Sequence, residues 1–277
     1  MPEPDAETPL LELRDVQVHL SVGQPIPGRR RPLLRAVDGV DLRLRRGAAL
    51  GLVGESGCGK STLARTIVGL QTATAGSILL EGRPLGARRP PQVRRRLQMI
   101  FQDPASSLNP RLTVEQTLAE LLRVHRLAPG GQVRARVSEL LQLVGLRDEL
   151  RAAHPGRLSG GQRQRVGIAR ALALQPEILI ADEPISALDV SVQASILNLL
   201  ADLRRRLGLT IVFIAHNLAV VRQLCDEVAV MYLGRIVEQA PAAQLFGNAR
   251  HPYTQRLLEA VPRLRPGSWA PSGGLDA

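Results

Sequence analysis

Residues 54–61 read GESGCGKS, which fits the pattern G-x-x-x-x-G-K-[ST]. The motif lies between an apolar stretch at 48–53 and residues 61–70, whose spacing is helical. In a strand–turn–helix setting, the glycines let backbone N–H groups converge on phosphate oxygens, and the helix N-terminus adds partial positive charge. Lys60 is predicted to reach the β- and γ-phosphates and Ser61 to ligate Mg²⁺. A chance match, on the order of one in a thousand, is the alternative.

The lysine of this motif stands out in the composition. Lys60 is the sole lysine among 36 basic residues, so this position requires a compact ammonium where the rest of the chain uses arginine. The net charge is +11, and the arginines fall in short groups, at 29–31, 94–96 and 204–206, without interleaved aromatics. Solvated helix faces therefore explain the charge better than a nucleic-acid or lipid surface, although a charged partner stays open.

Length and composition limit the class of protein. With 277 residues and 44% hydrophobic content, the chain holds one large domain, with or without a small appendage, and is not disordered or fibrous. It has no run of about 18 apolar residues, and we expect residues 1–9 (MPEPDAETP), which are acidic and Pro-rich, to form a disordered tail instead of a signal peptide. Two cysteines, Cys58 and Cys225, support neither a disulfide framework nor a metal site. We expect a cytosolic chain under reducing conditions.

Outward from the motif, the apolar pattern predicts a sheet. Residues 10–20 and 37–44 partly alternate as half-buried strands do, with an exposed Gly-, Pro- and Arg-rich loop between them. Apolar runs at 177–181 and 210–215 each follow a helical stretch, which indicates parallel strands joined by crossover helices.

The rest of the chain divides into a helical segment and a carboxyl-terminal part. Residues 103–155 have leucines at helix-face intervals, as an inserted helical lobe would. Residues 228–239 (VAVMYLGRIVEQ) predict a strand, a turn and a strand. From residue 240, a short helix and a Pro/Gly-rich tail follow.

Two carboxylates, Asp182 and Glu183, come directly after the apolar run ILIA. They would lie at the carboxyl end of a buried strand, where open α/β sheets bind ligands. In phosphate-loop proteins such an aspartate holds Mg²⁺ through water, and a following glutamate polarises the attacking water. Alone the pair would be an ordinary strand-end turn; the phosphate loop about 120 residues earlier reverses that interpretation.

Residues 158–162 read LSGGQ and precede a helix that begins near Gln162. A serine N-cap followed by a flexible glycine pair is the plain interpretation. With this motif added, however, the chain resembles the ABC-type ATPases, whose defining signature is LSGGQ, from residue 10 to about 264. Further motifs follow the family order: Gln102 in MIFQDP, SALD at 186–189, and His216 after TIVFIA.

The resemblance implies a role for each of these residues. Glu183 would be the catalytic base, with Gln102 and His216 positioning, and Ser61, Gln102 and Asp182 would serve the metal. The LSGGQ motif would contact the γ-phosphate of ATP bound to the opposite subunit, and Asp189 would lie in a loop that crosses the dimer interface. The implied nucleotide contacts are Gly54, Glu55, Ser56, Gly57, Cys58, Gly59, Lys60, Ser61, Thr62, Leu158, Ser159, Gly160, Gly161, Gln162, Asp189 and Leu20.

The fold implied is an α/β P-loop NTPase with a RecA-like parallel sheet core, an antiparallel β subdomain and an inserted helical subdomain at about 103–160. The nucleotide-binding domain would span 10–236, and a carboxyl-terminal extension 237–277. Leu20 stands where the family usually stacks adenine on an aromatic; dispersion contact from Leu20 and stacking by His19 are both open. Because a thiol at a helix start tends towards a lower pKa, we expect alkylation of Cys58 to block nucleotide binding.

A finer resemblance is to the oligopeptide/dipeptide/nickel importer ATPases, specifically the second of their two unlike ATPase subunits. It is carried by FQDPASSLNPRLTV, SALDVSVQASILNLL, MYLGRIVE and HPYTQRLLEAVP. It implies a sister ATPase in a heterodimer, with a homodimer possible, two integral membrane subunits, an extracytoplasmic solute-binding protein, and a place on the cytoplasmic face of the inner membrane. No nucleic acid is expected.

Two other functions compete with importer membership. A soluble ABC ATPase of DNA repair or translation would typically carry two ATPase units or long coiled-coil insertions, and this chain has neither. A non-hydrolysing regulatory subunit is opposed by the presence of Glu183 and His216. Nothing in the sequence separates peptide from nickel, glutathione or another small cargo.

Overall fold

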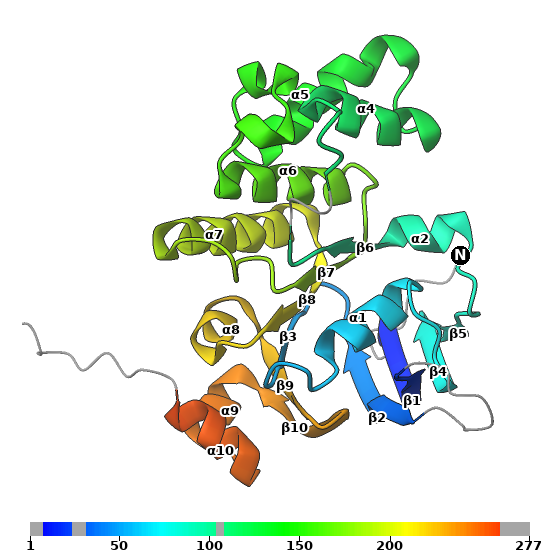
Figure 1. Ribbon diagram of the computed structural model, residues 1–277, viewed down its shortest axis with the longest axis vertical. Coiled ribbons are helices and arrows are strands. Elements are labelled where there is room, and N and C mark those ends of the chain that lie inside the picture. The colour runs from blue at the N-terminus through cyan, green and yellow to red at the C-terminus, as the bar shows by residue number, and fades with distance from the viewer. Residues whose placement is uncertain (1–7, 24–31, 104–107, 261–277) are drawn as a thin grey trace, which may run out of the picture.

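The computed structural model describes residues 8–23, 32–103 and 108–260. Two β-sheets lie side by side, helices cover them, and a helical lobe rises above the larger sheet (Figure 1). The predicted tail at 1–9 falls largely, and the end of the chain from 261 wholly, outside the described residues. Within the described part of the chain, no helix is both long and apolar enough to cross a membrane.

The larger sheet has six strands in the order β10-β9-β3-β8-β7-β6. Strands β9, β3, β8, β7 and β6 run parallel, and β10 is antiparallel at the edge. β3, β7 and β8 are buried along their whole length, as is typical of a parallel sheet covered on both faces. The strands are β3 (Ala49–Val53), β6 (Leu97–Ile100), β7 (Ile178–Asp182), β8 (Thr210–Ala215), β9 (Glu227–Tyr232) and β10 (Arg235–Pro241).

The smaller sheet is antiparallel, with the order β2-β1-β4-β5. β1 (Leu11–Ser21) and β2 (Leu33–Leu44) form its longest pair, and β4 (Ala75–Leu80) and β5 (Arg83–Pro84) follow. β1 bends at Asp15, where φ is 45°. Gly76 of β4 lies against this bend, because a Cβ there would come within 2.1 Å of the Asp15 carbonyl oxygen. Together the two sheets confirm the predicted α/β fold with an antiparallel β subdomain.

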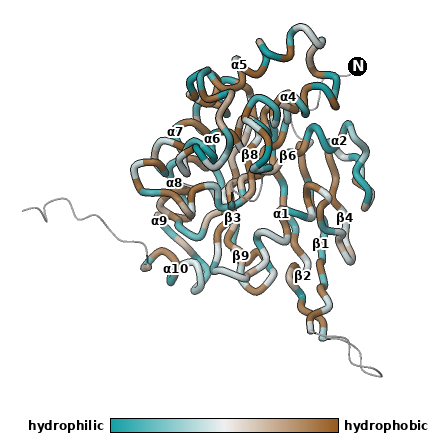
Figure 2. Tube along the Cα trace, turned by 45° about the horizontal axis from the view of Figure 1, so that its top comes forward, coloured by the Kyte–Doolittle hydropathy of each residue, from teal (hydrophilic) through white to brown (hydrophobic). Residues whose placement is uncertain are grey.

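Alternate residues of the larger sheet face two separate hydrophobic cores. On one face, Ala49, Phe213 and Val228 pack with residues of α6, α7 and α8. On the other, Leu50 and Val212 pack with α1 and the smaller sheet. Figure 2 shows hydrophobic residues along the strands in the middle of the molecule. The helices are α1 (Lys60–Val68), α2 (Pro91–Arg96), α6 (Gly160–Leu172), α7 (Val190–Leu207), α8 (Leu218–Leu224), α9 (Ala242–Gly247) and α10 (Pro252–Glu259).

The helical lobe is built on α4 (Val114–Val124) and α5 (Val133–Leu143), with one short 3-10 turn (Gly130–Gln132) between them and two more after α5. Thr113 begins α4 with a reciprocal capping box to Gln116. Leucines from both helices form its buried centre, and α6 packs against both. The helix that follows LSGGQ thus supplies part of the core of the lobe, and the predicted boundary at about residue 160 stays a prediction.

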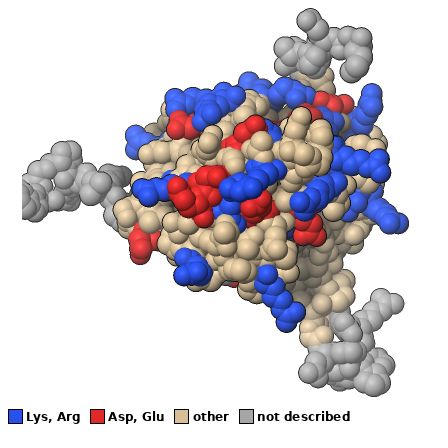
Figure 3. Space-filling model, turned by 90° about the horizontal axis from the view of Figure 1, so that it is seen from above, with Lys and Arg blue, Asp and Glu red and all other residues tan. Residues whose placement is uncertain are grey.

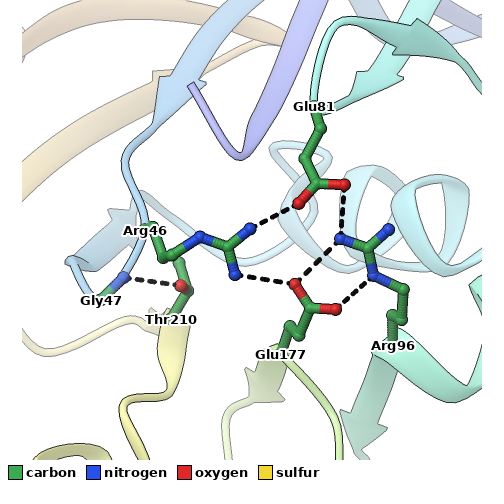
Figure 4. Close-up of polar contacts among 6 residues, drawn as sticks. All are labelled: Arg46, Gly47, Glu81, Arg96, Glu177 and Thr210. Atoms are coloured by element: carbon green, nitrogen blue, oxygen red, sulfur yellow. Dashed lines mark hydrogen bonds and ion pairs between the residues drawn. The ribbon is translucent and has the colours of Figure 1, made fainter. Parts of the chain in front are cut away.

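Four charged side chains join the two sheets at the amino end of β7 (Figure 4). Arg46, which follows β2, bonds Glu177 at 2.9 Å and also pairs with Glu81, which follows β4. Arg96, the last residue of α2, bonds Glu81 at 2.8 Å and also pairs with Glu177. We call these four residues the charge cluster; it lies at the end of β7 opposite to Asp182.

Candidate functional site

The loop between β3 and α1 turns tightly because glycines stand at its two ends. Gly54 has φ 155° and Gly59 has φ 110°, a conformation that residues with a side chain rarely adopt. A Cβ at Gly54 would lie 2.1 Å from the Met231 carbonyl oxygen, and one at Gly59 would lie 2.0 Å from the Ala36 carbonyl oxygen. Ser56 and Gly57 are exposed at the crest between them. The loop is thus pressed against β9 and β2 and open to solvent at its crest.

Lys60 begins α1 and folds back over this loop. Its Nζ donates to the carbonyl oxygens of Gly54 at 2.7 Å and Glu55 at 2.8 Å. The side chain is 4% exposed, although a buried ammonium is costly unless it is bonded. The two carbonyls therefore hold a positive charge beside the exposed crest, where an anionic ligand would meet it.

Ser61 and Asp182 bring two oxygen ligands together next to Lys60. The Ser61 hydroxyl donates to Asp182 Oδ1 at 2.8 Å, and the carboxylate, at the end of β7, is 2% exposed. Burial raises the pKa of Asp182, and the Ser61 hydrogen bond and the charges of Arg65 and Lys60 oppose that shift. A buried hydroxyl–carboxylate pair of this kind suits a hard divalent cation, which prefers oxygen ligands and would compensate the buried charge.

Side chains from three separate segments of the chain meet at the Glu183 carboxylate. Gln102 Nε2 lies 3.3 Å from Glu183 Oε2, and His216 Nδ1 lies 3.3 Å from the same oxygen. Glu183 has φ 45°, and its N–H donates to the Ile214 carbonyl oxygen at 3.1 Å. A left-handed glutamate directly after a buried strand is a strained arrangement of the kind that clusters at functional sites.

A cavity of about 80 Å³ opens beside this carboxylate, lined in part by Glu183, Ser186, His216 and Asn217. Its size and partly polar lining allow it to hold water. A carboxylate with an imidazole and an amide on the same oxygen is placed to accept a proton from a water in this cavity.

Residues 158–162 lie apart from the phosphate loop of the same chain, in the helical lobe (Figure 1). Ser159 caps α6, accepting from the Gln162 N–H at 3.2 Å, and its own N–H donates to Gln162 Oε1 at 2.9 Å. The plain interpretation as a helix cap is therefore correct as local structure. Leu158 is buried, while Ser159 is exposed at the helix start.

The glycine pair after Ser159 allows close packing. A Cβ at Gly161 would lie 2.6 Å from Val192 Cγ1 of α7, and one at Gly160 would lie 3.3 Å from Leu188 Cδ2. The loop before α7 begins at Ser186, whose hydroxyl donates to the Glu183 carbonyl oxygen at 3.1 Å. The predicted signature and the predicted interface loop thus form one surface of this chain.

Asp189 begins α7 without capping it through its side chain, and it is exposed. Its neighbour Val190 is 82% exposed, an unusual position for an aliphatic side chain at a helix start. Both residues follow Leu188, which lies against Gly160 at the start of α6, so they and Ser159 define a candidate interface.

The remaining predicted contacts lie around the loop. Thr62 is in the first turn of α1, where its carbonyl accepts from Thr66. Cys58 is buried, with Sγ 3.7 Å from Lys60 Nζ, so burial limits the access of alkylating reagents. Leu20 of β1 is partly buried against the core that includes Cys58, and it pairs with Leu34 across the sheet. The adenine contact through Leu20 or His19 stays a prediction.

One residue at this site had no sequence prediction. Tyr253 of α10 accepts a hydrogen bond from the Glu55 N–H at 2.9 Å, although the two residues lie far apart in the chain. The segment HPYT carried only the resemblance to the importer ATPases. In the structure His251 caps α10, because its Nδ1 accepts from the Tyr253 N–H at 3.2 Å. A contact between segments so distant leaves no periodic pattern in the sequence.

The family follows from matches over most of the chain. Residues 37–186 match the family model described as ABC transporter, and residues 237–272 match that of the oligopeptide/dipeptide transporter, C-terminal region. The chain belongs to the ABC transporter family of ATP-binding proteins, and it is an ATPase. This confirms the resemblance drawn from the phosphate loop, LSGGQ and the motifs between them.

Particular relatives are named for peptide transport. The chain is 48% identical over 258 residues to the oligopeptide transport ATP-binding protein OppF of Bacillus subtilis, covering 91% of this chain and 82% of that protein. It is 49% identical over 259 residues to OppF of Escherichia coli, covering 91% and 78%. It is 47% identical over 268 residues to the dipeptide transport ATP-binding protein DppF of Escherichia coli, covering 95% and 80%.

Solved structures of similar fold include cbiO1 of Clostridium perfringens, part of the ABC transporter complex cbiONQ. The TM-score is 0.74 at 29% identity, covering 87% of this chain and 92% of that one. The ATP-binding cassette MJ0796, in a dimeric post-hydrolysis state bound to ADP and Pi, gives a TM-score of 0.73 at 28% identity, covering 84% and 98%. These likenesses confirm the predicted fold class.

Proposed function

We propose that this chain binds ATP at residues 54–62, hydrolyses it with Glu183 as the base, and couples hydrolysis to the uptake of peptides or a similar small solute. The convergence of Gln102 and His216 on Glu183, beside the Ser61–Asp182 pair, carries the proposal. The names of the relatives and the match of residues 237–272 support peptide as the cargo class. They favour an importer ATPase over a soluble repair or translation factor.

In the proposed reaction, Lys60 and the loop N–H groups bind the phosphates and fix the terminal phosphoryl near Glu183. Glu183 accepts a proton from water in the adjoining cavity as that water attacks in line. His216 and Gln102 position the carboxylate and the water. The imidazole keeps its proton on Nδ1 when it donates to Glu183 Oε2, which leaves Nε2 free to turn towards the nucleotide.

We propose that Ser61 and Asp182 hold Mg²⁺ together with the phosphates of ATP, with Gln102 close by. The ion, when bound, neutralises charge on the transferred phosphoryl group. Among the described residues, no cluster of three or more histidine, cysteine, aspartate or glutamate side chains offers a complete protein cage for a metal. Two protein oxygens next to a phosphate site are the usual arrangement for magnesium in such proteins.

The proposed active unit is a head-to-tail pair of ATPase subunits. Ser159 of one subunit would complete the site that contains Lys60 of the other, because α6, which Ser159 caps, lies apart from α1 and the phosphate loop of its own chain. Exposed Asp189 and Val190 next to Ser159 fit a contact between subunits. We propose a sister ATPase as the partner, with a homodimer as the alternative, on the cytoplasmic face of the inner membrane.

A groove of about 540 Å³ beside the helical lobe is the proposed seat for a membrane subunit. Its lining is largely apolar and is crossed by arginines, and it includes Arg94, Phe101, Val124 and Leu174. Phe101 of this groove is followed directly by Gln102, whose side chain bonds Glu183. A membrane-subunit segment that displaces Phe101 would therefore also displace Gln102 and change its contact with the catalytic carboxylate. An extracytoplasmic solute-binding protein would deliver cargo to the membrane subunits.

The test is reconstitution of the chain with its sister ATPase and two membrane subunits in proteoliposomes. ATP-dependent peptide uptake is expected, and Glu183→Gln should keep ATP binding while lowering turnover at least about a hundredfold, the scale of a lost general base. Near-normal turnover in Glu183→Gln would assign the base elsewhere. Purification with nucleic acid or ribosomes, without membrane subunits, would contradict the transport proposal.

A further inference from the structure

The carboxyl-terminal helix α10 contacts the phosphate loop through a buried phenol. Tyr253 is 2% exposed, and its hydroxyl accepts from the Glu55 N–H at 2.9 Å. Glu55 is the second residue of the GESGCGKS loop, and its carbonyl oxygen accepts from Lys60 Nζ at 2.8 Å. Both polar groups of the Glu55 backbone are thus engaged, the N–H by Tyr253 and the carbonyl by the lysine of the site.

The helix that carries the phenol is fixed to β10 at its first turn. The carboxylate of Glu238 in β10 accepts from the N–H groups of Arg250 at 2.8 Å and His251 at 3.0 Å, directly before α10. Burial raises the pKa of Glu238, but nearby donors, the two N–H groups among them, outweigh burial and leave that pKa below its ordinary value. The start of α10 is therefore fixed on β10 by an ionised carboxylate.

The aromatic ring fixes the direction of the hydroxyl. Tyr253 packs on Tyr232, the last residue of β9, with ring centroids 4.2 Å apart and planes tilted by 38°. The preceding residue, Met231, presents the carbonyl oxygen that a Cβ at Gly54 would approach to 2.1 Å. The ring and the first glycine of the loop therefore lie against the same end of β9.

A second contact supports the other side of the loop. The Gly234 N–H, in the turn between β9 and β10, donates to the Cys58 carbonyl oxygen at 3.0 Å. Figure 1 shows β9, β10 and α10 together at one end of the larger sheet. The carboxyl-terminal part of the chain thus contacts the phosphate loop at both Glu55 and Cys58.

We infer that Tyr253 is a positioning residue for the phosphate loop. Its phenol holds the Glu55 peptide in the orientation in which the Glu55 carbonyl fixes Lys60, so the loop is ready for ATP before ATP arrives. Without the phenol the loop samples other conformations, and the apparent affinity falls in proportion to the fraction that stays competent. This inference rests on the proposed binding of ATP at residues 54–62, and it makes the extension that follows β9 part of the nucleotide site of its own chain.

Tyr253→Phe tests the inference in the full chain paired with its sister ATPase. Phenylalanine keeps the ring on Tyr232 and removes only the acceptor of the Glu55 N–H, which leaves a polar group unpaired in the absence of water. We expect the Kd for ATP and the KM to rise roughly fivefold, with kcat within about twofold, because the loop is the same once nucleotide is bound. Amide hydrogen exchange without nucleotide should be faster at Glu55.

Tyr232→Phe is the matched control, the same change in the stacked ring without a hydrogen bond to the loop. It should leave the Kd for ATP, the KM and the exchange at Glu55 unchanged. A Tyr253→Phe protein with a lower melting temperature but unchanged Kd and exchange would overturn the inference, since the phenol would then only stabilise the fold.

If Tyr253→Phe does not fold, Glu238→Ala serves instead, because it loosens the start of α10 while the phenol stays. A raised KM for ATP with little change in kcat supports the inference, and an unchanged KM counts against it. Failure of the proposed function looks different: the unaltered chain would then bind no ATP, or would bind it equally well after Lys60→Ala.

Discussion

The position of the Lys60 ammonium is set by the backbone of the phosphate loop. Its ammonium reaches two carbonyl oxygens, at 2.7 and 2.8 Å, from a side chain that is 4% exposed. A guanidinium is larger, planar and fixed in its geometry, so it cannot take both bonds in the same enclosed space. Everywhere else in this chain the basic residue is arginine, which makes the substitution Lys60→Arg informative.

We expect Lys60→Arg to weaken ATP binding at least roughly tenfold although the charge is kept, because the fork displaces the loop carbonyls. Titration with a fluorescent ATP analogue measures this directly. The reverse exchange on an exposed helix face, Arg134→Lys in α5, is the control and should change nothing. Wild-type affinity in Lys60→Arg would show that charge alone is needed at this position.

At the residue scale the sequence assigned the side chains that carry reactive groups, but not the residues that hold them in place. Lys60, Ser61, Asp182 and Glu183 were assigned from short motifs, and the structure brings the first three into contact or near-contact. Tyr253 could not be assigned, because its partner is a backbone N–H far away in the chain and backbone groups carry no sequence signal. The roles of Glu183 and His216 stay predictions that the mutants will decide.

Among elements, the charge cluster joins α2 and β7 to the turns after β2 and β4. Burial raises the pKa of Glu177, but hydrogen bonds from Arg96 and Arg46 outweigh it and lower that pKa below its ordinary value of 4.5. Because the pKa is lower in the folded state, the carboxylate stabilises the fold fully above about pH 4.5 and loses this contribution as the pH falls through the folded-state pKa.

Glu177→Gln should therefore lower the free energy of unfolding by about 1 kcal/mol at pH 7, a value kept modest because the cluster is partly exposed. The difference from the unaltered chain should shrink as the pH falls below the ordinary glutamate range. Urea unfolding at several pH values measures both effects. Glu139→Gln, which removes an exposed ion pair with Arg136 in α5, is the control. An equal loss of unfolding free energy in that variant would show that the charge cluster stabilises the fold no more than an exposed ion pair does.

The contact between α6 and α7 depends on the absence of one methyl group. Gly161→Ala places a Cβ 2.6 Å from Val192 Cγ1, and overpacking of this kind costs about 1–3 kcal/mol. Gly167 lies in the same helix with no atom within 4 Å of its Cβ position, so Gly167→Ala should be stabilising by about 0.5–1 kcal/mol.

Thermal melting of both variants compares two identical substitutions in one helix. Adding Val192→Ala to Gly161→Ala should recover part of the loss, because it removes the methyl groups in conflict. If Gly161→Ala and Gly167→Ala change the melting temperature equally, α6 and α7 are not in close contact. Close packing then does not explain the glycine pair.

The elements that the sequence left unpredicted are short or at edges. β6 has four residues, β5 two and α2 six, too few for a period to appear. β4 was missed although it is paired with β1, since its first residues are exposed. The long buried strands and the helical lobe were predicted, because their apolar spacing extends over enough residues to be distinctive.

For the molecule as a whole, the charge is spread and mixed in sign. Viewed from the end that carries the helical lobe, acidic residues lie among the arginines, and no broad region of one sign covers that face (Figure 3). A net charge of +11 distributed in this way favours solvated surfaces over a track for nucleic acid. A second subunit is needed to complete the proposed site, because Ser159 and Lys60 lie in different parts of one chain.

We expect the Glu183→Gln chain to form a stable complex with the proposed sister ATPase only when ATP is present, since bound nucleotide would join Lys60 of one subunit to the LSGGQ helix start of the other. Size-exclusion chromatography with light scattering measures the association. Adding Ser159→Arg, which places a long charged side chain at that helix start, should abolish it while ATP still binds. Association independent of both ATP and Ser159 would rule out the head-to-tail arrangement.

The solitary lysine has a practical consequence. Reagents that acylate primary amines find one side-chain target in this chain, and in the folded protein that target is enclosed by the carbonyls of Gly54 and Glu55. The rate of modification at residue 60, followed by mass spectrometry, would therefore report how often the loop opens, without any engineered probe.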